Sequence, residues 1–83
     1  MPSEIHYKSS VARDLKQIGP EDKQRILDKI RETLSVDPRA GEPLRGELEG
    51  LHKLRIGDYR VIYALVGDNV LVLRIRHRSS VYG

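Results

Sequence analysis

The chain has 83 residues, a formal net charge of +3, 33% charged residues and no cysteine. This length predicts one domain over residues 1–83 with a single small core, which favours a surface groove over a deep pocket as the functional site. The composition excludes a disulfide framework, a thiolate zinc site and a membrane helix, and the N-terminus lacks a signal-peptide pattern, so we expect a cytoplasmic protein.

Residues 3–8 are the first predicted element, a short strand. Their side chains alternate, with Ile5 and Tyr7 on one face, because successive side chains of a strand point to opposite sides. So short a strand does not form a stable sheet alone, and we expect it at an edge of a larger sheet.

Two helices are predicted next. Ser9 or Ser10 suits the N-cap of a helix that ends near Gly19, and Pro20 suits the first position of a second helix, which Pro38 stops. Apolar residues recur at helical spacing on both helices: Val11, Ala12, Leu15 and Ile18 on the first, and Ile26, Leu27, Ile30 and Leu34 on the second. The tight connection makes them an antiparallel helical hairpin.

After a Pro- and Gly-rich surface loop over residues 37–50, the stretch LHKLRIGDYRVIY at residues 51–63 predicts two strands. Gly57-Asp58 is a two-residue hairpin signal between two alternating runs. With this loop length, Ile56 lies opposite Tyr59 and Arg55 lies opposite Arg60. The apolar faces of the two strands therefore coincide, and two arginines lie side by side on the other face.

A third strand is predicted over residues 70–78, VLVLRIRHR. Its apolar face holds Leu71, Leu73, Ile75 and His77, and its other face holds Val70, Val72, Arg74, Arg76 and Arg78. Matching the apolar faces places Leu65 opposite Leu71, which leaves residues 67–69 as a three-residue loop. In this register Arg60 lies opposite Arg76.

These elements predict an α+β fold, in which the helical hairpin packs on the apolar face of an antiparallel sheet and the basic face stays open. Arg55, Arg60 and Arg76 form one row on that face, with Lys53 and Arg78 beside it. Like charges opposite each other destabilise a sheet, so the row favours a bound anion, nucleic acid first. A solvated polar face is the open alternative. The formal charge is +4 over residues 51–83 and −1 over residues 1–50.

Few other residues suggest chemistry, and no motif for a metal or a nucleophilic serine is present. His52 and His77 fall on the apolar face, which favours packed histidines, although a bulge would turn His77 outward as an acid or base. Tyr82 follows the densest basic run, where nearby cations lower the pKa of a phenol and suit it to proton transfer or base stacking.

Clustered cations and a tyrosine suit the cleavage of RNA, because the 2′-hydroxyl is itself a nucleophile. Cleavage needs a base for that hydroxyl, positive charge for the phosphorane and a proton for the leaving 5′-oxygen. The planar fork of arginine suits phosphate oxygens, and no metal is required. The residues alone thus indicate a phosphate-binding face, with ribonuclease activity as one interpretation.

The order strand, helix, helix and three strands, together with KLRIGDYRVIY at residues 53–63 and RHRSSVY at residues 76–82, resembles the RelE/ParE toxin superfamily. Within it, the chain is most similar to the RelE-like mRNA interferases. The resemblance implies a β-α-α-β-β-β fold and a toxin of a type II toxin–antitoxin system. It also implies a metal- and cofactor-independent endoribonuclease that cuts mRNA in the ribosomal A site, and a RelB-like antitoxin as partner.

Position by position, the resemblance implies a set of site residues. Those matched to the catalytic residues are Lys53, Arg60, Arg78 and Tyr82, and those assigned to RNA or phosphate binding are Arg55, Arg74, Arg76 and His77. Leu51 stands where some members have a second lysine, and the spacing from Arg78 to Tyr82 is compressed relative to the family.

Two other functions remain open on the same fold. A ParE-like member would inhibit DNA gyrase, and a non-catalytic member would bind nucleic acid without cutting it. A patch formed by Ile62, Ala64, Val70 and Val72 is our expected part of the antitoxin footprint, unless the loop leucines Leu44 and Leu48 cover it.

Overall fold

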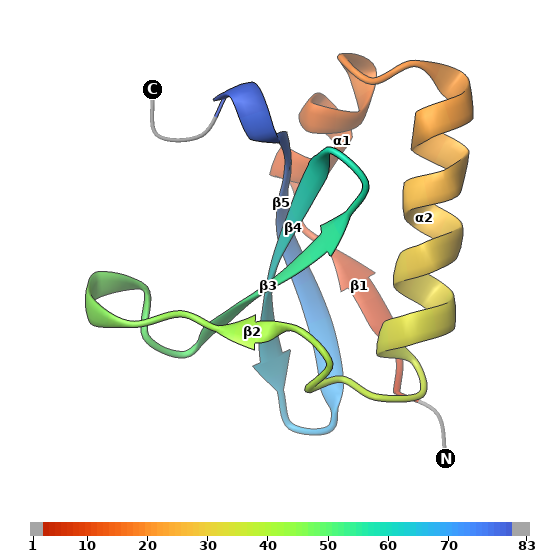
Figure 1. Ribbon diagram of the computed structural model, residues 1–83. Coiled ribbons are helices and arrows are strands. Elements are labelled where there is room, and N and C mark those ends of the chain that lie inside the picture. The colour runs from red at the N-terminus through yellow and green to blue at the C-terminus, as the bar shows by residue number, and fades with distance from the viewer. Residues whose placement is uncertain (1–2, 81–83) are drawn as a thin grey trace.

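The computed structural model describes residues 3–80 (Figure 1). The helices are α1 (Ser9–Lys16) and α2 (Pro20–Leu34), and two short 3-10 helices are η1 (Gly46–Leu48) and η2 (Arg78–Ser80). The strands are β1 (Ile5–Tyr7), β2 (Glu42–Pro43), β3 (Leu51–Ile56), β4 (Tyr59–Val66) and β5 (Asn69–His77). The predicted order of elements is confirmed, with the two-residue β2 added inside the expected loop. No helix within residues 3–80 is long and apolar enough to span a membrane.

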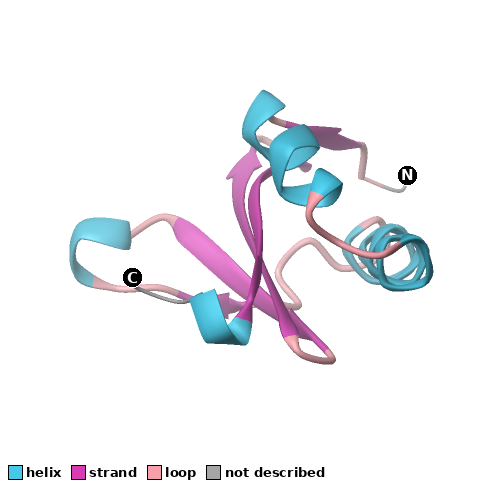
Figure 2. Ribbon diagram, turned by 90° about the horizontal axis from the view of Figure 1, so that it is seen from above, coloured by secondary structure: helices cyan, strands magenta, loops and turns pink. Residues whose placement is uncertain are grey.

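The five strands form one mixed sheet in the order β1-β5-β4-β3-β2. β1 lies at the predicted edge and runs parallel to β5, whereas the other neighbours are antiparallel. Seen from above, α2 lies end-on at one side of the twisted sheet, and the loop that carries η1 extends away from it (Figure 2). The fold is therefore α+β, with α2 on one face of the sheet and the basic face left uncovered by it.

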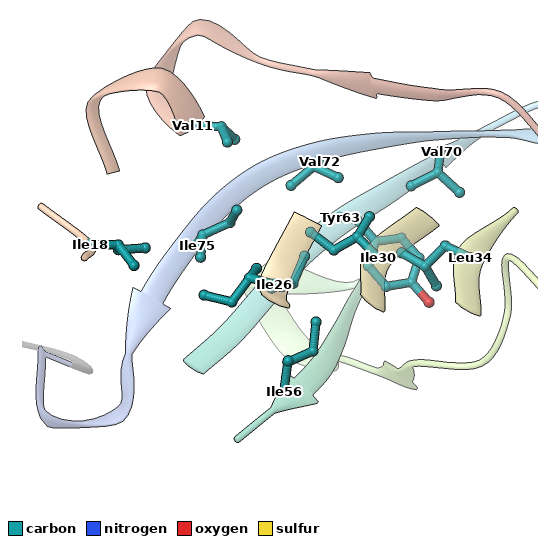
Figure 3. Packing of buried hydrophobic residues seen from close by; sticks show 11 residues of the cluster. Val11, Ile18, Ile26, Ile30, Leu34, Ile56, Tyr63, Val70, Val72 and Ile75 are labelled. Carbon is teal, nitrogen blue, oxygen red and sulfur yellow. The ribbon is translucent and has the colours of Figure 1, made fainter. Parts of the chain in front are cut away.

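The core lies between the helices and one face of the sheet, and both helices and three strands contribute to it (Figure 3). The buried apolar side chains are Val11, Ile18, Ile26, Ile30, Leu34, Ile56, Val61, Tyr63, Val70, Val72 and Ile75. The predicted helical stripes are confirmed apart from Ala12, which is exposed. Burial of this stripe is what fixes the helices on the sheet, since neither helix is long enough to be stable alone.

The β3–β4 hairpin has the predicted register. Ile56 pairs with Tyr59 and Arg55 pairs with Arg60. Gly57 takes a positive φ of 59° in the turn, a conformation that glycine adopts at little cost. The two-residue turn therefore fixes which side chains of β3 and β4 share a face.

The predicted pairing of β4 with β5 is right in one half and wrong in the other. Arg60 pairs with Arg76, as expected, but Leu65 pairs with Val70 rather than with Leu71. The register shifts by a β-bulge beside Ile62 and Tyr63, and the turn holds two residues instead of three. A β-bulge inserts one extra residue into a strand, and the even alternation of apolar residues in the sequence does not indicate it.

The bulge reverses which side chains of the first half of β5 face the core. Val70 and Val72 are fully buried, so our prediction that they lie on the open face is wrong. Leu71, between them, points to the opposite face and pairs with Ala64. The apolar patch on the open face therefore contains Leu71 in place of the two valines, beside Ile62 and Ala64.

Candidate nucleic-acid interface

Three arginines lie in one row across the open face of the sheet. Arg55, Arg60 and Arg76 occupy paired positions on β3, β4 and β5, and neighbouring strands lie about 4.8 Å apart. Their neighbours Ile56, Val61 and Ile75 are buried in the core, so the arginines project from the opposite face. Within residues 3–80, neither Arg55 nor Arg60 forms an ion pair. The row therefore places like charges together without a carboxylate between Arg55 and Arg60.

Arg78 lies outside this row. It begins η2, and its Nε is 3.8 Å from Oδ1 of Asp58 in the β3–β4 turn. Its backbone N–H also donates to the carbonyl oxygen of Asp58 at 2.8 Å. Both side chains are largely exposed, so the ion pair contributes little to stability. The geometry brings Arg76, rather than Arg78, beside Arg60.

Lys53 shares the face of the row but approaches the edge strand. Its Nζ is 3.8 Å from Oε2 of Glu42, its partner across β2 and β3. The lysine side chain is 15% exposed and the glutamate 69%. Lys53 is therefore mostly covered, and its amine lies beside a solvated carboxylate at the β2 edge of the sheet.

Arg74 is held by α1. Its Nε and Nη2 donate to Oδ2 and Oδ1 of Asp14 at 2.9 and 3.0 Å, and the N–H of Ile75 donates to the same Oδ2 at 2.9 Å. Partial burial raises the pKa of Asp14, but the hydrogen bonds from Arg74 and Ile75 and the charges of Arg74 and Arg76 lower it overall. The charge of Arg74 is thus matched inside the protein, which disfavours it as a phosphate ligand.

Asp14 and Ser10 were not predicted as site residues. Ser10 Oγ donates to the carbonyl oxygen of Leu73 at 2.6 Å, one helical turn before Asp14. The pattern in the sequence is only a polar i, i+4 pair on a short helix, and its partners are 60 or more residues away. No local signal marks such a pair.

His77 follows Arg76 on β5 and lies on the same face as the buried Ile75, where it packs edge-on against Tyr59 with ring centroids 5.1 Å apart. Its Nδ1 accepts the N–H of Ser79 at 3.1 Å and lies 2.7 Å from Ser79 Oγ. Because a backbone N–H only donates, the neutral ring carries its proton on Nε2. The orientation of an imidazole fixed in this way suits proton transfer.

Arg76 and His77 line a shallow hollow of about 400 Å³ at the end of the sheet. Asp14, Gln17 and Tyr59 form other parts of its wall. Ile18 and Ile75 also line it, so the hollow lies where α1 meets the edge of β5, on the core side of the sheet. Arg76 is the residue that the hollow and the arginine row share.

Two further residues singled out in the sequence are His52 and Tyr82. His52 stacks on Tyr63 with centroids 5.3 Å apart, which confirms a packed histidine. Tyr82 lies outside the described residues, so its predicted role stays a prediction. Among residues 3–80, no three side chains of metal-binding type gather at one place.

Comparison with known proteins adds a family to this geometry. Residues 5–82 match a family model described as the ParE toxin of the type II toxin–antitoxin system parDE. A protein named Toxin RelG, from Mycobacterium tuberculosis, is 33% identical over 99% of this chain and 98% of its own length. Toxin RelE from the same organism is 36% identical over 98% of this chain and 87% of its own length.

Solved structures share the fold. The RelBE2 toxin–antitoxin complex from Mycobacterium tuberculosis contains a chain that superposes with a TM-score of 0.88 at 31% identity, over 96% of this chain and 95% of that one. A RelB–RelE complex from Methanococcus jannaschii gives a TM-score of 0.72 at 21% identity, over 93% of this chain and 94% of that one. At that lower identity the likeness concerns the fold alone.

Proposed function

Since the chain belongs to the RelE/ParE family of type II toxin–antitoxin toxins, we propose that it is an endoribonuclease that cuts mRNA in the ribosomal A site. The observation that carries this proposal is the row of Arg55, Arg60 and Arg76 on the open face of the sheet. Adjacent like charges cost stability, and a bound phosphate chain offsets that cost.

In the proposed reaction the 2′-oxygen of one nucleotide attacks the adjacent phosphorus. The O2′–P bond forms, the P–O5′ bond breaks, and the products carry a 2′,3′-cyclic phosphate and a 5′-hydroxyl. A base takes the proton of the 2′-hydroxyl, and an acid gives a proton to the leaving 5′-oxygen. The reaction needs no cofactor, because the nucleophile belongs to the RNA.

The basic side chains have different proposed roles, according to where each lies on the sheet. Arg60 and Arg76 lie on neighbouring strands at paired positions, where two guanidinium groups can share the charge that develops on the phosphorane. Arg55 extends the row toward the next phosphate. Lys53 and Arg78 lie near the row, each 3.8 Å from a carboxylate that a phosphate would have to displace.

The proposed proton-transfer group is His77 or Tyr82. His77 has a fixed ring and lines the hollow beside Arg76. The family resemblance assigns the role to the tail tyrosine, Tyr82. Replacing each residue in turn distinguishes them, because only the variant that lacks the proton-transfer group loses the rate that this group supplies.

The proposed partners are the ribosome with its mRNA and a RelB-like antitoxin. The solved relatives from Mycobacterium tuberculosis and Methanococcus jannaschii are complexes of a RelE-type toxin with its antitoxin. The antitoxin footprint on this chain would include the open-face apolar patch of Ile62, Ala64 and Leu71, which lies beside the arginine row. Covering that patch would also block the approach of RNA.

Cleavage of mRNA on programmed ribosomes tests the proposed function. We expect one cut in the A-site codon, with a 2′,3′-cyclic phosphate at the new end. A matched mRNA with a single 2′-deoxy nucleotide at the cut position should bind equally well and stay intact. Cleavage of the deoxy substrate, or no cleavage of either, would contradict the proposed chemistry.

Inhibition of DNA gyrase is the second candidate function. The matching family model is described as a ParE toxin, which favours it. Supercoiling by gyrase, measured with the same protein preparation, separates the two. Loss of supercoiling without any cut in ribosome-bound mRNA would assign the chain to the gyrase inhibitors, and the reverse result would support the ribonuclease.

A further inference from the structure

We propose that Ser10 and Asp14 of α1 are positioning residues that set the phase of β5 and thereby hold Arg76 beside Arg60. By the phase of the strand we mean which of its alternating side chains face the core. The role of Arg76 toward phosphate rests on the proposed function, whereas the control of strand phase does not. Neither α1 residue lies on the arginine row itself. Their effect passes through the backbone of β5.

β1 pairs with only part of the edge of β5 that faces away from β4. β1 pairs with this edge only as far as Val72, whose carbonyl oxygen accepts the N–H of Lys8 at 2.9 Å. Beyond that point α1 replaces the strand. Ser10 Oγ donates to the carbonyl oxygen of Leu73, and Asp14 Oδ2 accepts the N–H of Ile75. Two side chains one helical turn apart thus satisfy the edge groups that a longer β1 would have paired.

The bulge in β5 lies where α1 contacts the strand. Tyr63 pairs with Val72 and Ile62 pairs with Arg74, so Leu73 is the extra residue on β5. The two hydrogen bonds from α1 fall on Leu73 and on Ile75, on either side of Arg74. They therefore hold the backbone at the point where the strand changes phase.

The bulge decides which side chains in the second half of β5 face the core. Val70 and Val72 are buried, so regular alternation without a bulge would turn residues 74 and 76 toward the core as well. With the bulge, Ile75 is buried instead, and Arg76 lies opposite Arg60 on the open face. One inserted residue lets the same strand bury valines at one end and present an arginine at the other.

Asp14 makes the arrangement specific to this phase. Its carboxylate also receives two hydrogen bonds from Arg74, and only 12% of its side chain is exposed. If the strand shifted by one residue, Arg74 would leave the carboxylate and Ile75 would lose its acceptor. The ion pair and the backbone bond thus favour the same register.

The test uses matched variants of the full chain. Asp14→Ala removes the acceptor for Ile75 and the partner of Arg74, Asp14→Asn keeps an oxygen acceptor without the charge, and Ser10→Ala removes the bond to Leu73. Asp28→Asn is the control, since Asp28 pairs with Arg31 on α2, away from β5. Thermal unfolding of each variant first establishes which of them are folded.

Strand phase is measured without any cleavage assay. In wild type and in Asp28→Asn we expect cross-strand nuclear Overhauser contacts between Arg60 and Arg76 and slow exchange of the Ile75 amide. In Asp14→Ala we expect that amide to exchange at least tenfold faster and the Arg60–Arg76 contacts to weaken, with both largely restored in Asp14→Asn. Unchanged contacts and exchange in folded Asp14→Ala would overturn the proposal. This result stands whether or not the protein cuts RNA.

Single-turnover cleavage supplies the functional test. We expect Asp14→Ala to lower the maximal rate by about tenfold or more with little change in substrate affinity, and to have no further effect in an Arg76→Ala background. Losses that multiply in the double variant would show that Asp14 does not act through Arg76 and would overturn the positioning role. Wild type that fails to cut, with strand phase behaving as expected, would contradict only the proposed function.

Discussion

Arg60 is the middle residue of the arginine row, paired with Arg55 on one side and Arg76 on the other. We predict that Arg60→Ala lowers the rate of mRNA cleavage by roughly 10²–10³-fold, because it removes charge stabilisation from the phosphorane. The measurement is single-turnover cleavage on programmed ribosomes. Arg39→Ala, at an exposed arginine of the loop after α2, is the control and should leave the rate unchanged. Cleavage at the wild-type rate by Arg60→Ala would remove this residue from the site.

The lowered pKa of Asp14 makes a second prediction at the residue scale, concerning stability. A carboxyl whose pKa is lower in the folded than in the unfolded protein stabilises the fold above about pH 4, and this contribution is lost as the pH falls through the folded pKa. The difference in unfolding free energy between wild type and Asp14→Asn should therefore be largest near neutral pH and shrink below pH 4 or so. Urea unfolding from about pH 3 to 7 measures it. A difference that grows on acidification would contradict the assignment.

The sequence predicted the arginine row but not the matching of Arg74. The pairing of Arg55 with Arg60 follows from strand alternation and a two-residue turn, which are local properties of residues 51–66. The bond between Arg74 and Asp14 joins residues 60 positions apart, and nothing near either residue indicates it. Arg74 was therefore assigned to RNA or phosphate binding together with Arg76, although the fold pairs Arg74 with Asp14 and places Arg76 opposite Arg60.

At the scale of elements, a local signal predicts the register of β3 with β4, whereas no local signal predicts the register of β4 with β5. The Gly57-Asp58 turn fixed the β3–β4 register before any tertiary contact was considered. The register of β5 depends on a bulge at Leu73, and α1 bonds to the backbone on both sides of Arg74. A pattern of alternating Val and Leu fits either face equally well, so hydrophobicity alone did not decide it.

The loop between α2 and β3 offers a prediction at this scale. Gly41 is buried, its N–H donates to Tyr63 Oη at 2.8 Å, and a Cβ there would meet that oxygen at 2.5 Å and the carbonyl oxygen of Lys53 at 2.9 Å. We predict that Gly41→Ala destabilises the protein by about 1–3 kcal/mol. Chemical denaturation measures the loss. Gly19→Ala, whose Cβ would meet nothing within 4 Å, should cost less, and equal losses would contradict the steric account.

At the scale of the whole molecule, positive charge is concentrated in residues 51–83, which include β3, β4 and β5, while residues 1–50 carry a slight negative charge. Binding of single-stranded RNA should weaken as salt increases, by a slope of about 0.7 in log–log units for each phosphate contacted. We predict that Arg55→Ala makes this slope shallower by about that amount. Fluorescence anisotropy with an uncleavable 2′-deoxy RNA measures it, with Arg39→Ala as the control. An unchanged slope would place Arg55 outside the RNA path.

The parallel pairing of β1 with β5 has a consequence for how the protein acquires its activity. Ile5 meets Val70, and the helix after β1 holds the phase of the strand bearing Arg76. Contacts so distant along the chain form late, and a nascent chain emerges with its first residues exposed long before residue 70 is made. The row of Arg55, Arg60 and Arg76 is therefore complete only after β5 has left the exit tunnel of the ribosome that synthesises the chain.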